Sequence, residues 1–187
     1  MTNIIEQGKP QRALINSAQI GQYLTFLVDQ ESFAINILDV KEIIEISHMT
    51  RVPLTPQFIH GVINLRGNVV PVIDLTARLK QHTAKVSKRS CIVLVEIHVS
   101  EGAQLIGMLV DEVREILEIP DNNIQPAPDF GTDIRTEFIQ AMARVDDIFI
   151  ILLAIDKVLS LSELSQLEHM VASHQEAAGE PVSSEVS

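Results

Sequence analysis

The sequence has little cysteine and few aromatic residues. Of its 187 residues one is a cysteine, Cys91, none is a tryptophan, and the aromatic fraction is only 4%. A single cysteine excludes a disulfide within the chain and is typical of a reducing compartment. So few aromatic rings also argue against a stacking platform for single-stranded nucleic acid.

Long apolar runs and the sequence signatures of common cofactor sites are missing too. The longest apolar runs, such as residues 148–155, are shorter than the about 20 residues that span a bilayer. The N-terminus has neither the basic start nor the sustained apolar stretch of a secretory signal. The 6 histidines show no metal-ligand spacing, and no glycine-rich phosphate-binding loop is present. We therefore expect a soluble cytoplasmic protein with no metal and no cofactor.

Positive charge is scarce in the second half of the chain. The net charge is −11; residues 1–90 hold 10 Lys and Arg against 7 Asp and Glu, whereas residues 91–187 hold 4 against 18. This balance argues against nucleic acid as the main partner. It gives the two halves different surfaces, which suits a protein with more than one docking face. An acidic surface that only keeps the protein soluble explains the charge equally well.

The 46% of hydrophobic residues are mostly Ile, Val and Leu, gathered in short segments between turn residues. Because no long helical pattern separates these segments, their spacing favours small β-barrels over an alternating strand–helix sheet. The expected strands are residues 22–28, 33–38, 61–65, 69–75, 91–98, 104–111 and 148–155.

The pattern becomes helical after residue 160. Leucines at 161, 164 and 167 recur at helical spacing, with Ser160 or Ser162 as N-cap, and predict a helix over 161–175. We expect this helix to pack on its own barrel, with a partner-binding helix as the alternative. Residues 1–18 read as a loose N-terminal segment and residues 176–187 as a disordered tail.

Two stretches of the chain are repeated. VKEIIEI at 40–46 reappears as VREILEI at 113–119, and residues 58–79 align without gaps on residues 138–159. Because order and approximate spacing are kept, the chain contains two copies of one small β unit. Features that both copies share are expected to serve the fold, and features of one copy only are candidates for function.

The two copies differ most at a polar turn. Asn64, Arg66 and Gly67 stand where the second copy has residues 144–147, which end in two aspartates. Gly67 suits a tight hairpin, and Pro71, which lacks a backbone donor, is expected on an edge strand or facing outward. The turn does not require Arg66, whose guanidinium can form forked hydrogen bonds with a carboxylate or with carbonyls. Arg66 is therefore the first candidate for a partner contact; a solvated surface arginine is the alternative.

The polar turn belongs to a longer run of motifs. NLRG followed by VVPVIDL, preceded by VKEI and RVPLTPQFIHGVI, resembles the CheW family of bacterial chemotaxis coupling proteins. IGMLVDEVREI and IQPAP fit as well, so the resemblance runs from about Tyr23 to about Leu159. It implies an all-β fold of two SH3-like five-stranded barrels, intertwined over residues 19–160 and related by pseudo-symmetry. One departure is Ala141, where the family usually has glycine. We expect a free-standing member, because no receiver or kinase segment is evident.

The resemblance also implies a function. Such proteins are non-enzymatic adaptors that link the cytoplasmic tip of chemoreceptors to the regulatory domain of the histidine kinase CheA. We expect a monomer in solution that is recruited into membrane-associated receptor arrays without entering the membrane. An amphipathic receptor helix would lie in a groove between the barrels, lined in part by the strand at Ser90–Ile92. Carried onto this sequence, the residues expected to contact the receptor or the kinase are Val40, Glu42, Asn64, Arg66, Gly67, Ser90 and Ile92.

Other functions stay open. The chain is alternatively a coupling protein of another chemosensory pathway, such as pilus-based motility, or a ring-forming scaffold without kinase regulation. A small hydrolase would require a deep polar pocket with converging titratable groups. The basic stretch 76–90 reads as a solvated connecting loop, or as a contact for an acidic partner. Cys91, flanked by Ile92 and Val93, reads as a buried packing residue.

Overall fold

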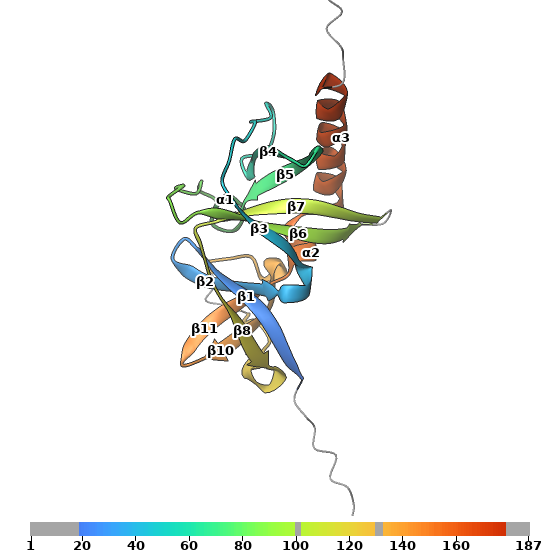
Figure 1. Cartoon of the computed structure of the whole chain (residues 1–187). Coiled ribbons are helices and arrows are strands. Elements are labelled where there is room, and N and C mark those ends of the chain that lie inside the picture. Colours follow the sequence, from blue (N-terminus) through green and yellow to red (C-terminus); the bar gives the residue numbers. More distant parts are fainter. Residues whose placement is uncertain (1–18, 100–101, 130–132, 179–187) are drawn as a thin grey trace, which may run out of the picture.

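The architecture comes from a computed structural model, which describes residues 19–99, 102–129 and 133–178 (Figure 1). The strands are β1 (Ile20–Val28), β2 (Glu31–Asn36), β3 (Val40–Glu45), β4 (Ile59–Leu65), β5 (Asn68–Asp74), β6 (Cys91–Val99), β7 (Gly102–Val110), β8 (Glu112–Pro120), β9 (Ile124–Gln125), β10 (Ile139–Val145) and β11 (Ile148–Leu153). The helices are α1 (Leu75–Lys80), α2 (Ile155–Val158) and α3 (Leu161–Ala178), with short 3-10 turns η1 (Ile37–Asp39), η2 (Asp121–Asn123) and η3 (Thr136–Phe138).

The strands form two sheets, each built from both halves of the chain. The first has the order β3-β6-β7-β5-β4 and the second the order β8-β1-β2-β11-β10-β9; we call them the first and second subdomain. The hairpin of β1 and β2 thus joins the later strands, and the hairpin of β6 and β7 joins the earlier ones. In Figure 1 the first subdomain lies above the second, with α3 beside the first. The expected all-β fold of two subdomains with a C-terminal helix is confirmed. The first sheet has the expected five strands, whereas the second has six, because the two-residue strand β9 is added at its edge.

The repeat copies occupy equivalent places in the two subdomains. The units β4–β5–α1 and β10–β11–α2 correspond, and each has a register shift at the same point of its first strand. A short antiparallel pairing lies at one edge of each sheet: Thr50 pairs with Val62, and Gln125 pairs with Met142. At Gly61 an added Cβ would lie 2.7 Å from the Thr50 carbonyl oxygen, so this close approach requires glycine. Ala141 stands at the equivalent shift in the second subdomain, where the same bend still forms.

Several strand assignments change. The VKEIIEI and VREILEI segments, whose periodicity alone is compatible with either a strand or a helix, are strands β3 and β8, and β10 was not among the expected strands. The expectation that Pro71 marks an edge strand or faces outward is wrong, because β5 lies between β4 and β7 and Pro71 is buried. Opposite it, Val62 exchanges both backbone hydrogen bonds, of 2.9 Å, with Thr50, and the pairing of β5 with β7 begins at Val72. The missing N–H therefore removes no ladder hydrogen bond.

The stretch 76–90 is not a solvated loop throughout. Its beginning forms α1, which is capped by the buried Asp74: one carboxylate oxygen accepts the Ala77 N–H at 3.0 Å, the other the Ala84 N–H at 2.9 Å. The side chain of Lys80 is only 9% exposed and pairs with Glu31 of β2 at 2.8 Å. The basic residues of α1 thus bind acidic groups of the same chain.

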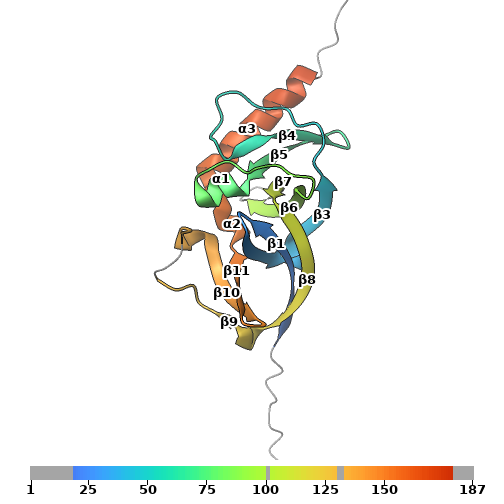
Figure 2. The same cartoon turned by 90° about the vertical axis from the view of Figure 1, so that its left-hand side faces the viewer.

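Helix α3 packs on the first subdomain, as expected, and contacts β5 (Figure 2). It extends three residues past the expected end at 175. Leu164 and Leu167 are buried in a core that takes side chains from both sheets, so the two subdomains and α3 share one hydrophobic cluster. In the described chain no helix is long and apolar enough to cross a membrane. The expected N-terminal segment 1–18 and residues 179–187 of the expected tail lie outside the described residues.

The start of α3 is a capping box. The Ser160 hydroxyl accepts the Glu163 N–H at 3.3 Å, and the Glu163 carboxylate accepts the Ser160 N–H at 2.6 Å. Two backbone donors that a helix start leaves unpaired are satisfied in this way. Ser160 is therefore the N-cap.

Candidate functional site

The polar turn is the two-residue hairpin between β4 and β5. Arg66 has φ +51° and Gly67 has φ +87°, as a type I′ turn requires, and the Asn64 side chain accepts the Gly67 N–H at 2.9 Å. Such turns favour Asn, Asp and Gly, whereas a left-handed backbone costs a residue with a larger side chain about 1 kcal/mol. Arg66 is thus held in a conformation that disfavours arginine, and the hairpin itself gives no reason for its presence.

The Arg66 side chain reaches across to β3. Its Nη2 donates to both carboxylate oxygens of Glu42, at 2.8 and 2.9 Å, although the two residues are 24 positions apart. The side chains are 71% and 38% exposed, so the Arg66–Glu42 pair lies at the surface. An exposed ion pair contributes at most about 1 kcal/mol to stability. Arg66 and Glu42, both expected to contact a partner, therefore form one surface ion pair that contributes little to the stability of the fold.

The second subdomain has no counterpart of this pair. Its equivalent turn, Asp146-Asp147, has φ +49° and +62°, so the backbone is the same while the charge is inverted. Arg144 donates to Asp147 within the turn at 2.6 Å. Glu115, the counterpart of Glu42, and Asp146, the counterpart of Arg66, carry like charges. Both subdomains thus have the glutamate, but only the first has the ion pair.

The remaining candidates differ in accessibility. Val40 is half-buried and packs against the shared core. Ser90 is buried, and its hydroxyl accepts the Ser87 N–H at 2.9 Å. Ile92 is 0% exposed and belongs to the core of the first subdomain. The side chain of Ile92 therefore offers a partner no surface, and that of Ser90 offers almost none.

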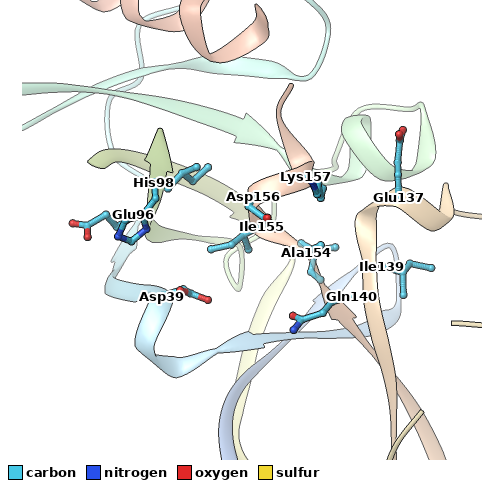
Figure 3. Close-up of a pocket in the computed structure, with 12 residues that line it drawn as sticks. Asp39, Glu96, His98, Glu137, Ile139, Gln140, Ala154, Ile155, Asp156 and Lys157 are labelled. Atoms are coloured by element: carbon cyan, nitrogen blue, oxygen red, sulfur yellow. The ribbon is translucent and has the colours of Figure 1, made fainter. Parts of the chain in front are cut away.

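Two cavities lie at equivalent places in the two repeat copies. One, of about 660 Å³, is lined in part by Glu137, Ile139, Gln140 and Ala154 (Figure 3). The other, of about 580 Å³, is lined in part by their repeat counterparts Gln57, Ile59, His60 and Asp74. Burial lowers the pKa of His60, and the nearby Arg51 lowers it further while Asp74 opposes the change. His60 is therefore neutral at pH 7.

The larger cavity is the place where a hydrolase would need its catalytic groups. Burial raises the pKa of Asp39 there, the charge of Asp156 adds to the rise, and His98 opposes it. In Figure 3, Glu96 and Glu137 extend from opposite sides of the cavity and do not face one another. Among the described lining residues no nucleophile donates to a base, the arrangement that such catalysis requires. Nor are three or more metal-ligating side chains of the described chain placed to hold an ion.

Cys91 lies at the start of β6 and is half-buried against the shared core. Burial raises the pKa of its thiol, with a smaller opposing effect from a hydrogen bond to the backbone of Val113. The thiol is therefore protonated at neutral pH, and Cys91 is a packing residue with no sign of an activated nucleophile.

Comparison with known proteins assigns the family. A family model described as the CheW-like domain matches residues 22–163. This chain belongs to the CheW family. It is 33% identical over 156 residues to the chemotaxis protein CheW of Klebsiella aerogenes, which covers 83% of this chain and 92% of that CheW. Protein FrzA of Myxococcus xanthus is 31% identical over 129 residues, or 68% of this chain and 78% of FrzA.

The fold agrees with a solved structure of the family. The crystal structure of the scaffolding protein TtCheW from Thermoanaerobacter tengcongensis superimposes with a TM-score of 0.70 at 34% identity. The match covers 80% of this chain and 94% of TtCheW. This chain therefore has the fold of TtCheW over most of its length.

Proposed function

We propose that this CheW-family protein is a non-enzymatic adaptor that couples the cytoplasmic tip of chemoreceptors to the regulatory domain of the histidine kinase CheA. It acts in the cytoplasm, where it is recruited to receptor arrays. Membership of the family and the names of its relatives support the pathway. The observation that carries the proposal is the Arg66–Glu42 pair, exposed, absent from the second copy and built on a backbone that disfavours arginine.

The pair is suited to binding because it is preorganised. Among the described residues Glu42 is the acceptor that contacts the Arg66 guanidinium, and it occupies only Nη2. Nη1 and Nε are left to donate to a carboxylate or carbonyl of a receptor or kinase. Because Glu42 already restrains the long side chain, less conformational entropy is lost on binding. Val40 on the same strand and the turn residues Asn64 and Gly67 complete the proposed surface.

Coupling follows from simultaneous binding. A protein that binds the receptor and the kinase together makes the conformational equilibrium of one depend on the state of the other. No group transfer or hydrolysis is needed for this. In solution the protein is a monomer, and it enters larger assemblies through its two partners.

Substitutions at the pair test the contact. Arg66→Ala should weaken binding to a receptor-tip helical fragment or to the kinase regulatory domain about tenfold, and should change the free energy of unfolding by no more than about 1 kcal/mol. The matched control is Arg144→Ala, which removes the arginine of the equivalent turn. Binding by isothermal calorimetry that is unchanged in Arg66→Ala for both fragments would contradict the proposed contact.

A charge swap separates two roles of the pair. The double variant Arg66→Glu with Glu42→Arg restores an ion pair between the same two positions. If the pair only fixes the hairpin, the swap should restore binding that Arg66→Glu alone has lost. If a partner contacts the guanidinium itself, as we propose, the swap should bind as weakly as the single variant.

The similarity to Protein FrzA favours a second candidate, a coupling protein of another chemosensory pathway, because FrzA does not carry the name CheW. The two candidates differ in the partner and not in the mechanism. Kinases and receptors from both kinds of pathway in the same organism, tested side by side for binding, would distinguish them. A protein that binds both partners but leaves kinase activity unchanged would be a ring-forming scaffold.

A further inference from the structure

Arg78 is a charged residue of α1 whose side chain is only 14% exposed. Its guanidinium makes three hydrogen bonds. Nε donates to the Val158 carbonyl at 2.6 Å, and Nη1 and Nη2 donate to the two oxygens of Glu163 at 3.0 and 2.9 Å. This forked pair with a carboxylate is the most directional ion pair that protein side chains form. Arg78 thus joins α1 of the first subdomain to the end of α2 and to the first turn of α3.

Two phenylalanine rings enclose the same guanidinium. Its carbon lies 4.5 Å from the centre of the Phe58 ring and 5.1 Å from the centre of the Phe138 ring, both within the range of a cation–π contact. Phe58 and Phe138 are repeat counterparts, 80 positions apart. The cation therefore lies between the two copies, where α1 and α2 come together (Figure 2).

The contact is asymmetric, although its surroundings are symmetric. The repeat counterpart of Arg78 is Val158, so Arg78 donates to the backbone of the residue that stands at its own position in the other copy. Both phenylalanines are shared by the copies and belong to the fold. Arg78 occurs in one copy only, which is the property that singled out Arg66.

The shared hydrophobic core alone does not define how the subdomains are oriented. Hydrophobic burial is non-directional and tolerates small rotations. A planar guanidinium that Glu163 of α3 holds by a fork, and that donates to Val158 of the second subdomain at 2.6 Å, does not tolerate them.

Other ion pairs also cross between the subdomains. Lys80 of α1 is 9% exposed and pairs with Glu31 of β2 at 2.8 Å, but its ammonium is a point charge without the fixed planar geometry of a guanidinium. Arg89, which pairs with Glu112 at 3.5 Å, is 77% exposed and contributes little. Among these pairs Arg78 combines burial, forked geometry and contact with three elements.

We propose that Arg78 is a positioning residue, which fixes the second subdomain and α3 relative to the first subdomain and so keeps partners on different subdomains in a defined relation. The second half of this statement rests on the proposed adaptor function. The first half concerns the protein alone and can be measured without any partner.

The relative placement is measured by the distance between two spin labels. Exposed strand positions in the two subdomains, Glu45→Cys on β3 and Gln125→Cys on β9, carry the labels in a background in which Cys91→Ala removes the native thiol. In Arg78→Met the distance distribution should be clearly broader than in the parent, because the rings and the core remain but the directional contacts are lost. The control Arg89→Met should keep the narrow distribution. A folded Arg78→Met with a distribution as narrow as the parent overturns the proposal.

If Arg78→Met does not fold, the label distances in Arg78→Lys test the positioning role instead. Lysine keeps the charge between the rings but not the fork, so this variant should fold and should still show a broader distribution than the parent. A narrow distribution in Arg78→Lys would mean that charge alone is sufficient, which contradicts the assignment of the positioning role to the guanidinium.

The effect of the receptor on kinase activity is the second measurement. Binding of the receptor fragment and of the kinase regulatory domain, each measured alone, should change less than about twofold in Arg78→Lys, while the effect of the receptor on kinase activity should fall about tenfold. A residue that only stabilises the fold would leave coupling intact in the folded variant, and that result would overturn the coupling role. If the unsubstituted protein couples nothing, the adaptor function fails, and the label distances still decide the positioning role.

Discussion

Replacing Arg78 and Glu163, separately and together, measures how strongly the forked ion pair attaches α3 to the rest of the protein. Arg78→Ala removes three hydrogen bonds and two ring contacts, and leaves Glu163 without its cation. Glu163→Ala removes the same fork and also the acceptor of the Ser160 N–H in the capping box.

The magnitudes follow from the burial of the pair. Breaking a buried pair by removing one partner costs about 3–5 kcal/mol, and each cation–π contact contributes about 0.5–1 kcal/mol at a partly exposed site. Because Arg78 and Glu163 are 14% and 22% exposed, water relieves part of this loss. We expect about 3–4 kcal/mol for Arg78→Ala and about 2–3 kcal/mol for Glu163→Ala. Their double-mutant coupling energy should be about 1.5–2 kcal/mol, well above the roughly 0.2–1 kcal/mol measured for fully exposed pairs.

Urea unfolding followed by circular dichroism provides the assay. With a slope of about 2 kcal/mol per M, Arg78→Ala should lower the unfolding midpoint by about 1.5–2 M at an unchanged slope. The Arg66–Glu42 pair, carried through the same cycle, is the exposed control. A coupling energy below about 0.5 kcal/mol for Arg78 and Glu163 would place their pair with ordinary surface pairs and refute the reasoning.

Three further substitutions test the local structure. Asp74→Asn should destabilise by about 1–3 kcal/mol, because an amide accepts only one of the N–H groups of Ala77 and Ala84; stability equal to the parent in urea would contradict these contacts. Gly61→Ala should cost about 1–3 kcal/mol because its Cβ meets the Thr50 carbonyl, while Ala141→Gly, the control, should cost less than about 1 kcal/mol in thermal unfolding. For Asp111, burial raises the pKa above the ordinary 3.8, so its ionisation destabilises the fold once pH rises through the folded-state pKa. Asp111→Asn should therefore raise Tm relative to the parent at pH 7 but not at pH 3.5, and an equal gain at both would refute the assigned cause.

The internal repeat made much of the fold predictable, because it reflects the pseudo-symmetry of two small β units. It also identified the turn at Arg66 as the main difference between them. The exchange of hairpins between subdomains was not predictable from local patterns, because β1 and β6 have the same strand character wherever they pair. The family resemblance placed Ile92 on a strand that lines a groove between the barrels, but its side chain is fully buried, and strand periodicity does not tell which face of a closing sheet points inward.

The contacts of Arg66 and Arg78 could not be predicted from the sequence, because each depends on how segments far apart in the chain come together. Arg66 and Glu42 were each identified, but their pairing depends on how the β4–β5 hairpin crosses β3. Arg78 lies in a Lys- and Arg-rich stretch that is typical of solvated loops. Only the approach of the two repeat phenylalanines creates its enclosed site. Comparing Arg78 with Val158 in the repeat alignment would have been the available signal.

Reconstitution of the three-component complex tests the adaptor function most directly. Kinase activity would be measured with receptor and kinase alone, with this protein added, and with Arg66→Glu added at the same concentration. We predict that the receptor controls kinase activity only when this protein is present, and that Arg66→Glu loses most of that control while remaining folded. Receptor control of the kinase that is the same with and without this protein would contradict the adaptor function.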